Sequence, residues 1–191
     1  MTGQPREPGE RPAPGERPAP GPVVRAATAA DAHAIATIRL ASWRATYAGI
    51  VPAALLDRMD LARNEAWIAG RLADPGGRAS LVVEAEPGRV AGYALTAPAR
   101  DDDAAGLGEL EAIYLDPGAR GQGLGRPLLD AALAELAAAG FGTVVLWVLT
   151  ANASARRFYE RAGFRPDGAV RTLDFDGTPI EEIRYRRAES R

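Results

Sequence analysis

A glycine-rich turn carries the residues with the clearest capacity for chemistry. It consists of Arg120, Gly121, Gln122, Gly123, Leu124 and Gly125, and a run rich in alanine and leucine follows it. Glycines let backbone N–H groups converge, and the N-terminus of a helix adds partial positive charge, so this pattern is typical of a pyrophosphate site. A second interpretation stays open, in which the glycines only permit tight packing.

Two other phosphate-binding motifs do not fit the turn. A Walker loop requires Gly-Lys followed by Ser or Thr, whereas Gly125 precedes Arg126 and Pro127. A dinucleotide fingerprint requires a glycine three residues after its second one, and that position holds Arg126 or Leu128, depending on the glycine that starts the count. With Leu124 as N-cap, Pro127 would be the third helical residue, where its missing N–H removes no intrahelical bond.

Composition restricts the chemistry further. The chain has 191 residues, with 23 Lys and Arg against 25 Asp and Glu, so its net charge of −2 offers no basic surplus for nucleic acid or anionic lipid. It has no cysteine and a single histidine, His33, which leaves no disulfide, no thiolate metal site and no histidine cluster for zinc. We therefore expect no metal, assign His33 no role, and expect catalysis by Glu, Asp, Tyr and backbone amides.

The amino-terminal residues differ in composition from the rest. They repeat Gly-Glu-Arg-Pro-Ala-Pro at 9–14 and 15–20, which predicts a disordered Pro-rich tail over 1–22. One domain is expected at 23–187, followed by a short tail at 188–191. No apolar run resembles a signal peptide or a membrane span, so we expect a cytoplasmic protein that does not bind membranes.

Hydrophobic periodicity and turn residues predict alternating strands and helices. Strands are expected at 23–26, 80–85, 90–95, 109–115, 143–149, 164–173 and 179–186. Helices are expected after Thr28 with Asp31 as its capping partner, through 55–72, from the glycine-rich turn to Gly140, and at 153–162. Two helices thus precede the main sheet, and the almost continuously apolar strand at 143–149 should be buried on both faces.

Two segments resemble a known family. Residues 109–129 are similar to the central motif of the GCN5-related N-acetyltransferases (GNAT), which combines a strand, a hydrophobic-Tyr-hydrophobic-x-Pro end and an Arg/Gln-x-x-Gly-x-Gly/Ala turn. Residues 152–164 resemble the family's Asn-x-x-Ala-x-x-Phe-Tyr-x-x-x-Gly-Phe segment. The order of elements also agrees over nearly all of 23–187, although Pro127 departs from the small residue expected there. The resemblance implies the acyl-CoA N-acyltransferase fold, a mixed α/β fold whose mostly antiparallel central sheet is flanked by helices.

The resemblance also implies an activity, the transfer of acetyl from acetyl-CoA to a primary amine by direct attack in a ternary complex. The expected acceptor is a small molecule, and a homodimer is a reasonable assembly. A protein Lys or N-terminal acetyltransferase is the alternative within the class, and a non-catalytic acetyl-CoA sensor is the alternative outside it. The Pro-rich tail could also dock a partner protein, which is compatible with catalysis.

Acetyl transfer needs a base, because a primary amine with a pKa of about 10.4 is mostly protonated at neutral pH. Glu109 and Glu111 are the candidates. The histone-modifying members of the family place their base where Glu109 falls, so Glu109 ranks first. Alternation puts both carboxylates on one strand face with Ile113, unless a bulge intervenes. The other interpretation is two glutamates on a solvated face.

The resemblance assigns the coenzyme to the turn with Arg126, and to three other features. Backbone N–H groups of Ile113, Tyr114 and Leu115 would pair with the pantetheine arm, and Leu115 is the favoured donor to the thioester carbonyl. Tyr159 would donate a proton to the departing thiolate, unless it is only a core aromatic. Asn152 would cap its helix, contact the pantetheine, or do both.

The acceptor side is assigned to Trp43, Tyr47 and the loop 49–52. Trp43 and Tyr47 are spaced i, i+4, and they could equally pack the first helix against the sheet. Asp101, Asp102 and Asp103 form an acidic run that could attract an amine, but we predict that it is an ordinary solvated loop.

Overall fold

The protein is described by a computed structural model over residues 21–175 and 177–188. Residues 1–20 of the predicted tail and residues 189–191 lie outside the described part of the chain. The proposed domain limits at 22/23 and 187/188 therefore stay predictions.

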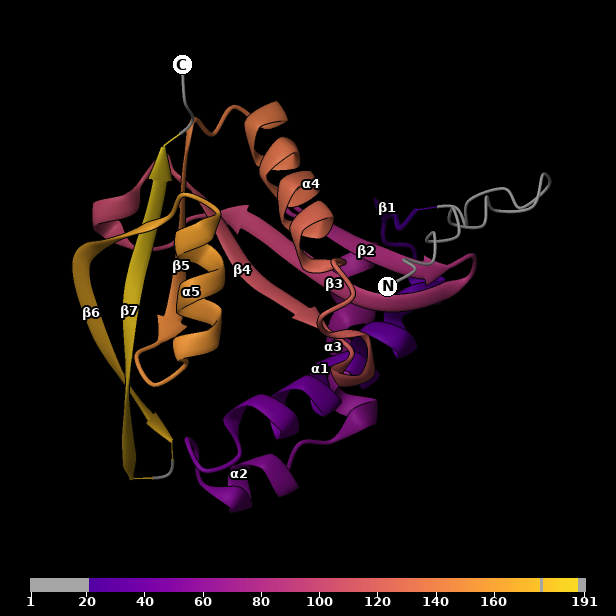
Figure 1. Cartoon of the computed structure of the whole chain (residues 1–191), viewed down its shortest axis with the longest axis horizontal. Helices are drawn as coiled ribbons and strands as arrows, with labels where there is room; N and C mark the ends of the chain where they lie inside the picture. Colours follow the sequence, from indigo (N-terminus) through magenta and orange to yellow (C-terminus); the bar gives the residue numbers. More distant parts are fainter. Residues whose placement is uncertain (1–20, 176, 189–191) are drawn as a thin grey trace, which may run out of the picture.

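One seven-stranded sheet forms the centre of the molecule (Figure 1), and its strand order is β1-β2-β3-β4-β5-β7-β6. All neighbouring strands are antiparallel except β4 and β5, which are parallel. This arrangement confirms the expected mixed, mostly antiparallel sheet. The strands are β1 (Val23–Ala26), β2 (Ala79–Glu86), β3 (Arg89–Pro98), β4 (Gly108–Leu115), β5 (Thr143–Leu149), β6 (Arg165–Phe175) and β7 (Thr178–Ala188).

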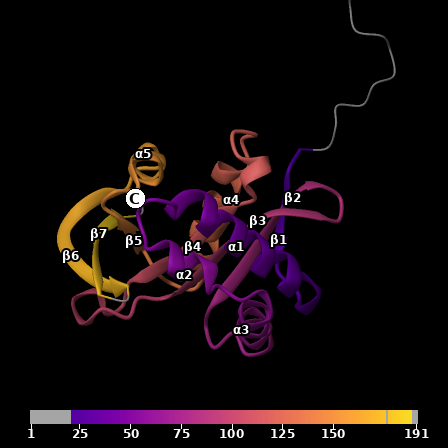
Figure 2. The same cartoon turned by 90° about the horizontal axis from the view of Figure 1, so that it is seen from below.

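Helices cover both faces of the sheet, and Figure 2 shows α4 and α5 on one side and α3 on the other. They are α1 (Ala32–Tyr47), α2 (Ala53–Asp57), α3 (Leu61–Ala73), α4 (Gly125–Ala138) and α5 (Ala153–Arg161). The single helix predicted through 55–72 was wrong, because the chain leaves the helical path before Asp60. The Asp60 side chain accepts a hydrogen bond from the backbone N–H of Arg63 and so starts α3 as a new helix.

Two apolar layers result. The first lies between the sheet and α4 with α5, and it includes Leu128, Leu129 and Phe164, none of which is exposed. The second lies between the sheet and α1 with α3, around Ile35 and Ile68. Burying each leucine contributes roughly 2 kcal/mol, so α4 is firmly fixed to the sheet, and with it the glycine-rich turn that precedes it.

The ladder between the two parallel strands is short. β4 pairs with β5 only at Gly108 with Val144 and at Glu109 with Val145. Beyond Glu109 the strands diverge, as Figure 1 shows, and leave a gap that widens toward the end of β4. Backbone groups on this edge of β4 therefore lack a strand partner.

A β-bulge in β4 decides which side chains share a face. Leu95 of β3 lies opposite Ala112, and the next residue, Thr96, lies opposite Leu110, so Glu111 is the extra residue. Leu110 packs against the α4 layer, whereas Ala112 packs against the α1 layer.

The bulge changes the strand pattern expected from simple alternation. Ile113 packs in the α4 layer, while Tyr114 packs in the α1 layer. Glu111 contacts Arg71 of α3, so Glu111 also lies on the α1 side, and Glu109 shares that face by alternation. The predicted grouping of the two glutamates with Ile113 was wrong, and the two carboxylates instead share a face with Tyr114.

Candidate active site

The glycine-rich turn has the geometry of a cradle for an anion. Gly121 and Gly123 both have φ of 78°, and a Cβ built on either would meet no atom within 4 Å. Leu124 is the N-cap of α4 and Gly125 its first residue, as predicted, and no side chain hydrogen-bonds the first turn of the helix. In that turn Pro127 has no N–H and Leu128 donates to the carbonyl of Leu124, so the N–H groups of Gly125 and Arg126 are left to bind a ligand.

Two side chains of the glycine-rich turn stabilise its conformation. The Gln122 amide nitrogen donates to the carbonyl of Gly118 at 3.0 Å. A guanidinium nitrogen of Arg120 donates to the Thr46 hydroxyl of α1 at 2.8 Å. These bonds shape the loop and leave its outer surface to the backbone amides.

Helix α5 lies directly beside the start of α4. A Cβ at Gly125 would be in van der Waals contact with the ring of Phe158, at 3.4 Å, so the two helices meet closely here. Arg126 in the first turn of α4 is held by Asp130, which accepts from its Nε at 2.8 Å. A ligand in the cradle would therefore contact both helices.

Free backbone donors line the β4 edge of the gap. The N–H of Asp116 donates to the carbonyl of Ala91 at 2.8 Å, which makes this a hydrogen-bonded pair of the β3–β4 ladder. Because such pairs alternate along antiparallel strands, the amide of Tyr114 faces β3, while those of Ile113 and Leu115 face the gap.

Ser42 of α1 is a site residue that the sequence analysis missed. It is completely buried, and its hydroxyl donates to the carbonyl of Leu115 at 2.6 Å. The bond fixes the end of β4 and occupies the Leu115 carbonyl while leaving its N–H free. A serine within the buried stripe of α1, two residues after Leu40, was the available signal.

Tyr159 lies where α5 faces the sheet. It is 9% exposed and packs between the rings of Phe158 and Phe164, with centroids 5.4 and 5.9 Å away. Burial raises the pKa of its hydroxyl, so the group stays protonated. Asn152 caps α5, because its side-chain oxygen accepts from the N–H of Ala155 at 3.1 Å.

The two candidate bases have different surroundings. Glu111 is held by Arg71, whose guanidinium lies 2.6 Å from its carboxylate and also donates to the Thr96 carbonyl. Glu109 is 6% exposed, and its nearest cationic partner is Arg100 at 3.8 Å. Burial raises the pKa of Glu109, Arg100 lowers it, and the charge of Glu111 raises it. Neither glutamate lies on a solvated face.

Replacing Arg100 with Gln is expected to raise the pKa of Glu109 further, because the substitution removes a positive charge that favours the carboxylate. The acid limb of the kcat/KM profile should then move to higher pH. Initial rates measured across pH test this, with Arg89→Gln as a control at another exposed arginine that lies on the β2–β3 turn. An unshifted limb would contradict the role of Arg100.

The acceptor candidates form one aromatic cluster. Trp43 and Tyr47 meet edge to face with centroids 4.9 Å apart, and the Tyr47 hydroxyl lies 3.0 Å from that of Tyr114. Phe175 and Ile180, from the tip of the β6–β7 hairpin, belong to the same apolar cluster as this helix end. Figure 1 shows the hairpin tip beside α2 and the loop before it.

Asp102 and Asp103 are exposed, as predicted for a solvated loop, but two of the three aspartates also bind residues of the neighbouring strands. Asp103 binds both terminal nitrogens of Arg184 at 2.7 Å, and Arg184 is only 6% exposed. Asp101 accepts from the indole N–H of Trp147 at 2.9 Å. Because β7 supplies a buried guanidinium, two of the three aspartates serve as its partners and close this side of the site.

The side of the site formed by β5, β6 and β7 contains further residues that the sequence analysis missed. Arg171 of β6 stacks on Trp147 at 4.2 Å and binds Glu182 of β7 at 2.7 Å. Trp147 lies two residues after Val145, the partner of Glu109, so it faces the acceptor side. The sequence alone could not predict that Trp147 lies on the same sheet face as Glu109, because this depends on the pairing of β4 with β5.

Comparisons with known proteins identify the family to which this fold belongs. The model of the family described as Acetyltransferase (GNAT) family matches residues 32–164. The N-acetyltransferase YuaI of Bacillus subtilis is 34% identical over 162 residues, which cover 84% of this chain and 89% of YuaI. The chain belongs to the GNAT family and is an acetyl-CoA-dependent acetyltransferase.

Other similar proteins match over different shares of the chain. A mycothiol acetyltransferase of Beutenbergia cavernae is 50% identical over 62 residues, so the aligned part is 32% of this chain and about a fifth (21%) of that protein. The structure of yncA from Salmonella typhimurium with acetyl-CoA has a TM-score of 0.69 and 26% identity, covering 90% of this chain and 96% of that one. A ribosomal-protein-alanine N-acetyltransferase from Brucella melitensis has a TM-score of 0.70 and 26% identity, with coverages of 87% and 99%.

Among residues 21–175 and 177–188, no helix combines the length and apolar character needed to cross a membrane. Within the same ranges, no three histidine or acidic side chains are placed to hold a metal ion.

Proposed function

We propose that the protein acetylates a primary amine of a small molecule by direct attack on the thioester in a ternary complex. One observation carries the proposal: the gap between β4 and β5 has unpaired amides on its edge and the buried carboxylate of Glu109 on the adjoining sheet face. A carboxyl group with a raised pKa is suited to taking a proton from an amine.

The coenzyme would lie along this gap. The glycine-rich turn and the first turn of α4 would hold the pyrophosphate, and the amide of Ile113 would pair with the pantetheine arm in place of a strand. The amide of Leu115 would donate to the thioester carbonyl as negative charge develops there. Asn152, at the N-cap of α5, would contact the same arm.

In the proposed reaction, Glu109 and Tyr159 act on the amine and on the leaving sulfur, respectively. Glu109 accepts a proton from the amine directly or through water, and the nitrogen lone pair attacks the carbonyl carbon. The C–S bond then breaks and the electron pair leaves with sulfur. Tyr159 donates a hydrogen bond to that sulfur, while its raised pKa makes complete proton transfer to a thiolate of pKa about 8.5 unfavourable.

The packing of the β6–β7 hairpin tip favours a small acceptor. The hairpin tip with Phe175 and Ile180 packs on Val51 and Leu56, which blocks the open groove that an extended peptide would need. The names of the relatives do not separate the alternatives, since one refers to mycothiol and another to a ribosomal protein.

Release of free thiol from acetyl-CoA, measured across a panel of small amines, peptides and amino-terminal peptides, tests the proposal. We expect turnover with one class of small amine and only background with peptides. Turnover confined to peptides would overturn the small-molecule assignment. Background rates with every acceptor, together with tight coenzyme binding, would favour a sensor.

Tyr159→Phe is expected to lower kcat by roughly 10-fold to 100-fold and to leave the affinity for acetyl-CoA nearly unchanged, because only the donor to the leaving sulfur is lost. Steady-state rates and calorimetric titration measure the two quantities. Tyr93→Phe is the matched control, since Tyr93 is fully buried in the other core layer. A kcat equal to that of the wild type would leave Tyr159 only its packing role.

A further inference from the structure

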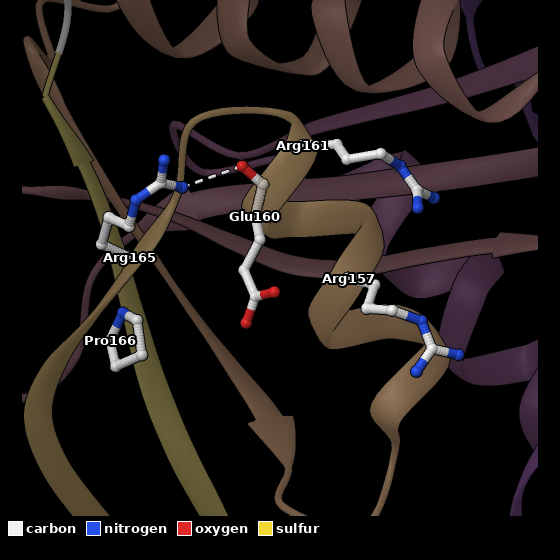
Figure 3. Close-up of a pocket in the computed structure, with 5 residues that line it drawn as sticks. All are labelled: Arg157, Glu160, Arg161, Arg165 and Pro166. Atoms are coloured by element: carbon white, nitrogen blue, oxygen red, sulfur yellow. Dashed lines mark hydrogen bonds between the residues drawn. The ribbon is translucent and has the colours of Figure 1, made fainter.

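A hollow lies beside the C-terminal half of α5. Its lining comes from the end of α5 and the start of β6, and Figure 3 shows its five residues: Arg157, Glu160, Arg161, Arg165 and Pro166. Three guanidinium groups in one hollow create a positive potential that the proposed acetyl transfer does not use.

The three arginines differ in how they are engaged. Arg165 is held in place, since it donates to the backbone carbonyls of Glu160 and Phe164 at 2.8 Å. Glu160, the acidic residue of the hollow, accepts a hydrogen bond from the Tyr185 hydroxyl at 2.7 Å. Over the described ranges of the chain, neither Arg157 nor Arg161 forms an ion pair with a carboxylate, and both are exposed.

These two free arginines lie near the phosphate cradle. Phe158 follows Arg157 and precedes Arg161 by about one helical turn, and its ring lies 3.4 Å from the position that a Cβ on Gly125 would occupy. Figure 3 shows the Arg157 and Arg161 side chains on the same side of α5, directed away from Arg165. An anion extending from the cradle past Phe158 would therefore reach them.

Coenzyme A carries such an anion. Its pyrophosphate accounts for the amides of the glycine-rich turn, but its ribose also bears a 3′-phosphate, a dianionic group that the turn does not accommodate. Of the two cations at the cradle, Arg126 is already paired with Asp130 and Arg120 donates to the Thr46 hydroxyl. We propose that Arg157 and Arg161 bind the ribose 3′-phosphate of coenzyme A, using the forked donors that suit a phosphate.

The inference rests on the proposed coenzyme site, and it adds that this site distinguishes between two forms of the coenzyme. The enzyme discriminates coenzyme A from 3′-dephospho-coenzyme A, which has the same pantetheine and pyrophosphate. Because both arginines are solvent-exposed, the preference is modest, about tenfold at low salt, and it shrinks as salt screens the charges.

Calorimetric titration of the full chain with coenzyme A and with 3′-dephospho-coenzyme A tests the inference. The wild type should bind coenzyme A about tenfold more tightly at low salt. The double variant Arg157→Gln/Arg161→Gln should bring the ratio of the two dissociation constants to about one without changing the affinity for the dephospho form. Arg63→Gln, an exposed arginine on α3, should leave both affinities unchanged.

Two results would overturn the inference: equal affinities in the wild type, which needs no variant, or a ratio that persists in the double variant. The dephospho form reports separately on the proposed coenzyme site. If that site were wrong, 3′-dephospho-coenzyme A would bind poorly to every variant, whereas failure of the arginine pair alone would leave its binding intact.

Discussion

Replacing Glu109 with Gln is expected to lower kcat/KM for the amine by about 10²-fold to 10³-fold at neutral pH. Gln keeps the shape of the side chain and removes its ability to accept a proton. In the wild type the rate should rise with pH as Glu109 loses its proton, at a pH above the ordinary range for a glutamate because burial raises its pKa. The variant should lack this rise.

Glu111→Gln is the matched control for this prediction. Glu111 is bound by Arg71 and lies close to Arg100, so it has little freedom to take a proton from an amine. We expect a smaller loss, since its role is to compensate buried Arg71. A larger loss in kcat/KM for Glu111→Gln than for Glu109→Gln, with both variants folded, would reverse the assignment of the base.

Thermal unfolding separates chemistry from stability. A carboxyl whose pKa is raised in the folded state favours folding below its unfolded pKa, and the contribution is lost as pH rises through the folded pKa. At neutral pH and above, the ionised Glu109 is therefore a cost to the folded state. The Glu109→Gln variant should melt at the same temperature as the wild type or higher, although it is nearly inactive.

Gly123→Asp is expected to raise the KM for acetyl-CoA by roughly 10²-fold, because like charges about 4 Å apart near a protein surface repel by several kcal/mol. The backbone at Gly123 has a positive φ and open space for a side chain, and Asp tolerates this conformation better than most residues. The new carboxylate would lie among the amides that we assign to the pyrophosphate.

Gly123→Asn isolates the charge from the backbone change. It has the same size and the same tolerance of positive φ, so we expect its KM to rise only a few-fold. Gly140→Asp, at the other end of α4 and also at positive φ, should leave KM unchanged. Initial rates at varied acetyl-CoA measure all three, and equal KM values for the Asp and Asn variants would remove the pyrophosphate from this turn.

The sequence predicted well what depends on local spacing. The glycine-rich turn, the start of α4 at Gly125 and the cap of α5 at Asn152 follow from residues close together in the chain. The strands were also predicted to within a few residues at each end, because turn residues separate them. The family motifs connected these elements to a coenzyme before any packing was known.

Features that depend on pairing between distant residues could not be predicted. The bulge at Glu111 depends on the register between β3 and β4, and no residue type within β4 predicts it. The ion pair of the exposed Asp103 could not be foreseen, because its partner Arg184 lies 81 positions away in the sequence. The different surroundings of Glu109 and Glu111 also depend on a residue distant in the sequence, because Arg71 of α3 binds only Glu111.

The short β4–β5 ladder has a consequence for the life of the protein in a cell. The ladder between β4 and β5 joins the two halves of the sheet through two residue pairs, and acetyl-CoA lying in the gap would bridge the halves. A ligand that binds only the folded state stabilises it in proportion to the logarithm of its concentration. When acetyl-CoA is scarce, we expect the enzyme to open more often and to be degraded sooner, so that its abundance follows the supply of the donor it consumes.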